Sequence, residues 1–150
     1  MELWLLLGML CAVASQKASE ITHGHSLRPS KKLFGEPKAI DPPFTVVVKE
    51  PSGEPAEYYE PGVKYTVEIT GQIKFRGFII QPRLATPDGF IIGHLRGGYF
   101  VEEEEWALYG VKFQTCPPIY NNSITNSNWK QKQTVKAAWT TDRMVGHIQF

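Results

Sequence analysis

The strongest constraint on the fold is VKYTVEIT at 63–70, in which apolar and polar side chains alternate without a break. Every odd-numbered residue is Val, Tyr or Ile, and every even-numbered one is Lys, Thr or Glu. Because successive side chains of a β-strand point to opposite faces, this pattern is typical of a strand with one face on a core and the other in water. Pro61-Gly62 before it and Gly71 after it mark its ends. We therefore expect a half-buried strand here.

A second apolar stretch, IKFRGFIIQPRL at 73–84, carries three cationic side chains towards its ends. A helix is disfavoured, because Gly77 and Pro82 interrupt any helical period and β-branched residues dominate. Both faces of an extended chain are apolar in the middle, so we predict one internal strand that Pro82 closes. This pattern argues against a free cationic membrane peptide. Packing alone does not explain Gln81 and Arg83, which we expect to anchor a loop by hydrogen bonds, with contact to a ligand as the alternative.

Short β-rich runs separated by Gly and Pro occupy the rest of the chain. They predict further strands at 44–50, 111–115, 134–139 and 147–150. In the third of these, Val135, Ala137 and Trp139 alternate inward. Turns are expected at Pro87-Asp88-Gly89 and at Gly97-Gly98, and a loop at 117–128. No amphipathic helix of useful length is visible, so the pattern predicts an all-β sandwich.

The N-terminus carries a short apolar run, LWLLLGMLCAVA, which ends in the small-x-small pattern of a signal-peptidase site. The run is much shorter than the roughly 20 residues needed to span a bilayer, and no later stretch qualifies. We predict a signal peptide at 1–14 and a secreted chain with no transmembrane segment. Residues 15–43 are polar and proline-containing, which predicts an extended arm before a sandwich at 44–150.

The charge balance excludes a nucleic-acid partner. The chain has 16 Lys and Arg and 15 Asp and Glu, and cleavage after Ala14 removes one acidic residue, Glu2. A nucleic-acid-binding domain needs a clustered basic face, which this near-neutral chain does not offer.

Cys116 is the one cysteine left after the predicted cleavage, since Cys11 lies in the leader. A lone cysteine in a secreted protein indicates a free thiol, an intermolecular bridge or a partner that is missing from this chain. A nucleophilic role would need a histidine beside it, and nothing places His94 or His147 there. Asn121-Asn122-Ser123 is an N-glycosylation acceptor, which predicts a glycan at Asn121 on a surface loop.

Other candidate sites are weaker. His23 and His25 are candidate metal ligands, but two imidazoles on an extended arm do not make a site, so we expect no metal. Glu102–Glu105 is expected to be a solvated acidic loop rather than a calcium site, because it lacks the spacing of an oxygen cage. Signature motifs of nucleotide-binding, hydrolytic and metal-dependent enzymes are absent. We expect no catalytic residue and no cofactor.

The aromatic residues divide into two groups. Trp139 lies on an alternating face and is expected in the core. Tyr58, Tyr59 and Trp129 lie in polar surroundings, where exposed aromatics favour recognition. We prefer the interpretation that these three pack beneath long loops.

In their order along the chain, these pieces resemble the reeler (reelin N-terminal) domain family over roughly residues 23–150. YEPGVKYTVEITG and FRGFIIQPR resemble the family's central signature, and QTCPP, SITNSN and VKAAWTTDRMVGHIQF resemble its later segments. The signature residues are Phe75, Gly77, Phe78, Gln81, Arg83, Trp139 and Gly146. The resemblance implies an immunoglobulin-like antiparallel β-sandwich in an extracellular protein.

The chain departs from the family pattern at three places. The family's N-terminal cysteine is absent near 23–29, which removes the usual intradomain partner of Cys116. Asn126 and Thr140-Thr141 replace the usual His and Ala-Pro. The last strand is also shorter than in family members, so we expect it to be incomplete, which leaves edge groups unpaired.

The resemblance implies a secreted, non-enzymatic protein of innate defence or extracellular recognition, similar to secreted arthropod-type defence proteins. Its partner is expected to be a microbial-surface or matrix component. The alternative is an extracellular matrix or adhesion module, or the N-terminal part of a larger protein of the matrix or ferric-reductase-like type.

Overall fold

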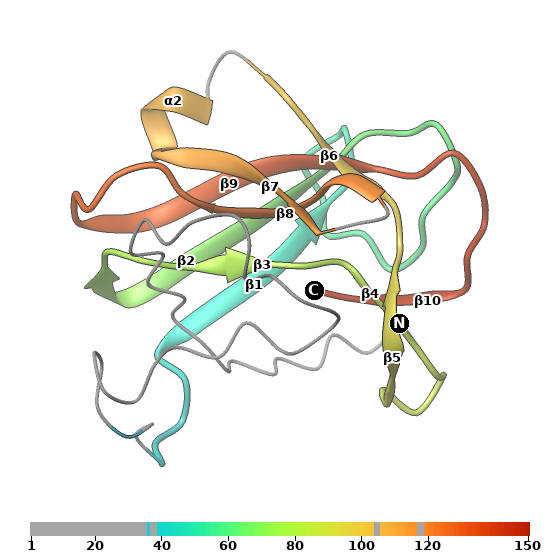
Figure 1. Ribbon diagram of the computed structural model, residues 1–150, viewed down its shortest axis with the longest axis horizontal. Coiled ribbons are helices and arrows are strands. Elements are labelled where there is room, and N and C mark those ends of the chain that lie inside the picture. The colour runs from blue at the N-terminus through green and yellow to red at the C-terminus, as the bar shows by residue number, and fades with distance from the viewer. Residues whose placement is uncertain (1–35, 37–38, 104–105, 117–118) are drawn as a thin grey trace.

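The computed structural model describes residue 36 and residues 39–103, 106–116 and 119–150 (Figure 1). The predicted signal peptide at 1–14, most of the arm at 15–43, and both His23 and His25 lie outside this part. The elements are β1 (Phe44–Lys49), β2 (Tyr65–Phe75), β3 (Ile79–Ile80), β4 (Arg83–Ala85), β5 (Ile91–Arg96), β6 (Tyr99–Val101), α2 (Trp106–Tyr109), β7 (Val111–Cys116), β8 (Ile119–Asn126), β9 (Lys132–Thr140) and β10 (His147–Gln149).

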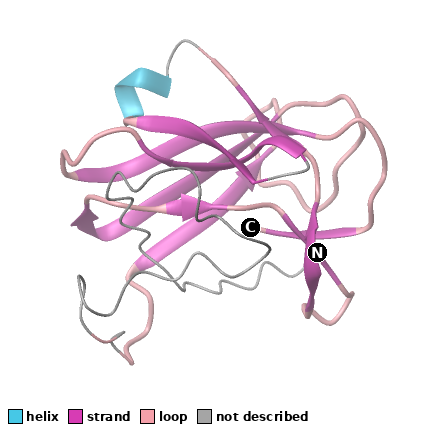
Figure 2. Ribbon diagram, in the orientation of Figure 1, coloured by secondary structure: helices cyan, strands magenta, loops and turns pink. Residues whose placement is uncertain are grey.

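The strands form a β-sandwich in which every pairing is antiparallel (Figure 2). One sheet has four strands in the order β1-β2-β9-β6, and two three-stranded sheets have the orders β10-β4-β5 and β3-β8-β7. The helix α2 is a single turn of four residues. The all-β prediction is therefore confirmed.

The alternation at 63–70 is confirmed in β2, where Tyr65, Val67 and Ile69 are buried. They face the core together with Val46 and Val48 of β1 and with inward residues of β9. Phe78, just before β3, and side chains from β3, β7, β8 and β10 complete this core: Ile80, Val111, Ile124 and Ile148 lie in the same cluster as Phe78. The burial of this apolar surface is the main favourable term in the stability of such a domain.

The prediction of one internal strand over 73–84 is wrong. The strand β2 continues through Gly71 to Phe75, with an irregular register between Thr70 and Phe75, and Ile73 is exposed. After a turn, the chain joins β8 as β3, and after Pro82 it joins β10 as β4. Pro82 does close a strand, as predicted, but it separates two different sheets.

The prediction of a loop over 117–128 is also wrong, because residues 119–126 form β8. The polar side chains that indicated a loop are buried and hydrogen-bonded: Thr125 Oγ1 donates to the carbonyl of Phe78 (2.7 Å), and Ser123 Oγ donates to Asn122 Oδ1 (3.3 Å). A buried polar strand is stable when its polar groups have such partners. Asn121 therefore lies in a strand rather than a surface loop, half-buried and with a φ of 52°.

Trp139 lies at one end of the core with 1% of its surface exposed. Its rings contact Tyr59, Tyr65 and Phe150, with centroids 5.4–6.0 Å apart. Its indole Nε1 donates to the carbonyl of Gly97 at 2.9 Å. This tryptophan thus joins the β1–β2 loop, the β5–β6 turn and the final strand, and its predicted core position is confirmed.

Candidate recognition surface on the outer face of the four-stranded sheet

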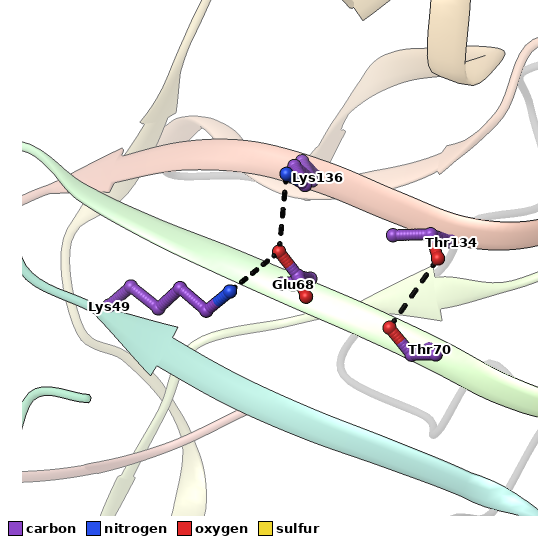
Figure 3. Close-up of polar contacts among 5 residues, drawn as sticks. All are labelled: Lys49, Glu68, Thr70, Thr134 and Lys136. Atoms are coloured by element: carbon purple, nitrogen blue, oxygen red, sulfur yellow. Dashed lines mark hydrogen bonds and ion pairs between the residues drawn. The ribbon is translucent and has the colours of Figure 1, made fainter. Parts of the chain in front are cut away.

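The outer face of the four-stranded sheet carries a set of facing polar side chains from three strands (Figure 3). In β2, the even-numbered residues Thr66, Glu68 and Thr70 point away from the core. Antiparallel pairing places Glu68 beside Lys136 of β9, and Thr70 beside Thr134. On the other side of β2, Lys49 of β1 pairs with Thr66. The sheet therefore brings together residues that are far apart in the sequence.

Glu68 binds two lysines through one oxygen. Its Oε2 lies 3.0 Å from Lys49 Nζ and 3.4 Å from Lys136 Nζ, and Figure 3 shows both contacts converging on this atom. Oε1 points the other way and has no hydrogen-bond partner in the described part of the chain. Each ammonium has three donors, so this triad keeps hydrogen-bonding capacity for a ligand.

A groove of about 330 Å³ lies over this triad. The loop after β1 forms one wall and is held by the bond from Gly53 N to the carbonyl of Glu50 (2.9 Å). Glu103, bound to Lys64 at 2.8 Å, and Tyr109 of α2 border the other side. The lining residues are Lys49, Glu50, Pro51, Gly53, Thr66, Glu68, Glu103, Tyr109, Lys136, Ala137 and Ala138.

Glu68 is ionised at neutral pH. Partial desolvation raises the pKa of its carboxyl, but the hydrogen bond from Lys49 and the charges of Lys49 and Lys136 together outweigh it, so the pKa lies below the usual 4.5. A carboxylate with a depressed pKa is a permanent acceptor rather than a proton donor. The groove therefore offers ammonium donors, hydroxyls and the ionised carboxylate of Glu68, which suits a polar ligand.

Glu68→Gln is expected to lower the stability at pH 7 by about 1 kcal/mol, the upper end for a partly exposed ion pair. The folded-state pKa is lowered, so the contribution of Glu68 is present above pH 4.5 and is lost as the pH falls through the folded pKa. Urea unfolding of both proteins from pH 7 to pH 3 should show two stabilities that converge in acid. A difference that does not change with pH would contradict this assignment.

The signature residues Gln81 and Arg83 do anchor a loop by hydrogen bonds. Gln81 Nε2 donates to Ser123 Oγ (2.9 Å), and Arg83 donates to Gln81 Oε1 and to the carbonyl of Gly93, both at 3.1 Å. This confirms the preferred expectation for the two residues. Phe75, Phe78 and Trp139 lie in the core, and the Gly146 carbonyl accepts a hydrogen bond from Tyr59 at 2.7 Å.

The aromatic group Tyr58, Tyr59 and Trp129 does not form one surface. Tyr59 packs on Trp139, and its hydroxyl accepts from Val145 N at 3.0 Å. Tyr58 and Trp129 are exposed, but they lie at opposite ends of β2, since Tyr58 precedes its first residue and Trp129 adjoins Lys132, the partner of its last. The preferred interpretation of packing beneath a loop thus holds for Tyr59 alone.

The Trp129 loop is held by two cations. Arg76 NH1 donates to the carbonyl of Trp129 at 2.8 Å. Lys132 Nζ lies 2.9–3.1 Å from the carbonyls of Lys130 and Asn128 and from Asn128 Oδ1. Burial, followed by the nearby Arg76 charge, lowers the pKa of Lys132. We assign this buried lysine a structural role, because backbone oxygens occupy its donors.

The remaining candidates are dispersed. Cys116 ends β7, whereas His94 and His147 belong to β5 and β10 of another sheet; the side chains of Cys116 and His94 lie outside the described part. Glu102 and Glu103 are exposed, and Glu103 binds Lys64. Across the described residues, no three His, Cys, Asp or Glu side chains gather as a metal site would require. Within the same part, the helices fall short of the length and hydropathy needed to span a bilayer.

Sequence reasoning did not identify the groove. Alternation in β2 indicates that Glu68 faces outward, but the pairing that places Lys49 and Lys136 beside it depends on strand order and register. The spacing of these three residues in the sequence indicates neither the strand order nor the register.

Comparison with known proteins shows the family of this domain. The Reeler domain family model matches residues 25–150. The chain belongs to this family. It is a reeler-domain protein, a module of the extracellular type, as the resemblance implied. No curated protein sequence matches the chain.

Solved structures of reeler domains are similar in fold. A crystal structure of the human F-spondin reeler domain matches with a TM-score of 0.52 and 18% sequence identity. The matched region covers 77% of this chain and 76% of the F-spondin chain. A structure of the Reelin-N domain of F-spondin has a TM-score of 0.48 and 17% identity, with 73% and 70% covered. The likeness to the first structure, at a TM-score of 0.52, shows the β-sandwich fold.

Proposed function

We propose that this protein is a secreted, non-enzymatic reeler-domain protein of innate defence or extracellular recognition, which binds its ligand through the outer groove. The observation that carries the proposal is the Lys49–Glu68–Lys136 triad on a rigid sheet of a reeler domain. Three paired strands hold its backbone, so little order is lost on binding. The ionised Glu68 and the two ammonium groups offer an acceptor and donors to a polar ligand.

The ligand class follows from the groove chemistry. Lysines, carboxylates and hydroxyls border a shallow hollow of mixed charge, which suits hydroxyl-rich or zwitterionic groups rather than a long apolar molecule. Such groups occur on microbial surfaces and in the extracellular matrix. We take a microbial surface as the first candidate and a matrix or adhesion role as the second.

A binding screen of the secreted product tests the function. Protein from a secretory host is incubated with intact bacteria, yeast and decellularised matrix, and the bound fraction is measured. Binding to a microbial surface is expected; binding to matrix alone would support the adhesion role instead, and binding to neither would contradict the proposal. Intact mass of the same product tests the predicted cleavage after Ala14, the glycan at Asn121 and the state of Cys116.

A further inference from the structure

The hairpin formed by β4 and β5 exposes an unusual amount of apolar side chain. Phe90 is 70% exposed, and Ile91, Ile92 and Leu95 are 38%, 43% and 55% exposed. Figure 1 shows this hairpin extending beyond the body of the sandwich. Isolated exposed apolar residues are ordinary, but a contiguous set on a projecting element indicates an interaction site.

Hydrogen bonds close the hairpin tip. Thr86 N donates to the carbonyl of Phe90 at 2.8 Å, and Phe90 N donates back to Thr86 Oγ1 at 3.0 Å. Gly89, with a φ of 87°, completes the turn. The backbone of the tip is therefore held in one turn, which lowers the backbone entropy lost when a partner buries its apolar side chains.

Apolar side chains occur on both faces of the hairpin. Ile91 and Ile92 are consecutive in a strand, so they point to opposite faces, and both are exposed. A flat protein interface covers one face of a strand, whereas a fluid apolar phase surrounds the tip from all sides. The two-faced pattern fits insertion into a lipid surface.

Pairing of β5 with another strand is disfavoured. Gly93 lies in the middle of β5 with a φ of 51°, outside the β-region, and its carbonyl accepts from Arg83 NH1. The register between β4 and β5 is also irregular at this point. Irregularities of this kind protect a strand edge from pairing. They therefore disfavour edge-to-edge association of β5 with a second copy of the chain.

Cationic side chains outnumber carboxylates on the hairpin. Arg83 and Arg96 face each other at its base, and Asp88 at the turn is its one carboxylate. We propose that the β4–β5 hairpin inserts its apolar tip into the surface of an anionic phospholipid membrane. The ring and aliphatic side chains of the tip enter the acyl boundary, and the cationic base of the hairpin lies towards the phosphates, where it supplies long-range attraction while Arg83 keeps its bonds to Gln81 and Gly93.

Vesicle flotation with the full secreted protein tests the proposal. Wild type is expected to float with vesicles of phosphatidylcholine and phosphatidylglycerol, and much less with phosphatidylcholine alone. The double variant Phe90→Ser, Ile92→Ser should reduce the bound fraction at least about tenfold, with an unchanged melting temperature because both side chains are exposed. Tyr58→Ser removes an equally exposed aromatic elsewhere and should bind as wild type.

Several results would overturn the proposal. These are no flotation of wild type, flotation independent of phosphatidylglycerol, or a double variant that floats like wild type. Loss of a dimer in the double variant, measured by sedimentation equilibrium, together with unchanged flotation would assign the hairpin to self-association instead. Thr66→Tyr in the groove should leave flotation unchanged, so the lipid proposal and the proposed function fail separately.

Discussion

Trp139→Ala is expected to lower the free energy of unfolding by about 4 kcal/mol, as for other buried aromatic truncations. The side chain is almost fully buried, contacts three rings and donates to the carbonyl of Gly97. Its loss leaves a cavity where the β1–β2 loop, the β5–β6 turn and β10 meet. For a domain of this size the melting temperature should fall by about 15 °C, measurable by calorimetry.

Two further variants make this result interpretable. Trp129→Ala removes an exposed tryptophan, and should change the stability by less than about 0.5 kcal/mol. Trp139→Phe keeps a ring but removes the indole donor, and should lose about 1–2 kcal/mol, which provides a folded variant if the alanine variant does not accumulate. Equal losses at positions 129 and 139 would contradict the assigned core.

Gly98→Ala is expected to destabilise the domain by about 3 kcal/mol. The φ of Gly98 is 78°, and an added Cβ would meet the carbonyl oxygen of Thr140 and the indole of Trp139. Backbone strain and overlap with β9 therefore act together, because neither the backbone nor the buried ring can move away easily. Urea denaturation measures the loss.

Gly62→Ala is the matched control for Gly98→Ala. Its φ is 80°, but an added Cβ would have nothing within 4 Å. Strain alone then acts, and the expected loss is about 1 kcal/mol. If both alanine variants lost the same stability, close packing of Gly98 against β9 would be refuted.

Local patterns predicted those parts of the fold that local rules control. Alternation in β2 and β9 identified both strands and the inward side of each, since one face meets the core and the other meets water. The turns at Pro87-Asp88-Gly89 and Gly97-Gly98 were predicted from their turn-forming residue types, and Gly89 and Gly98 have a positive φ there. Hydrogen bonding of Gln81 and Arg83 followed from the absence of a packing reason for them.

The two wrong element predictions have a common physical cause. In β8, buried Asn122, Ser123 and Thr125 have hydrogen-bond partners. Some of those partners are the residues on either side of β3, Phe78 and Gln81, which no local pattern reveals. Residues 73–84 are largely apolar, as predicted, but they are divided among β2, β3 and β4 in three sheets. This division depends on which strand each of the three pairs with. Tertiary context decided both cases.

The groove could not be predicted for a related reason. Lys49, Glu68 and Lys136 come from three strands, and their proximity follows from the order β1-β2-β9. A sequence reading treats each as one solvated charge on a strand surface.

Binding at the groove is the central claim, and one pair of variants tests it directly. Thr66 and Thr70 both face outward from β2, but Thr66 lines the groove and Thr70 does not. On the surface identified in the binding screen, Thr66→Tyr should weaken equilibrium binding at least about tenfold, because the phenol fills the ligand space, equivalent to about 1.4 kcal/mol. Thr70→Tyr should bind as wild type. If both tyrosine variants bind as wild type, or both lose binding alike, the outer groove is not the recognition site.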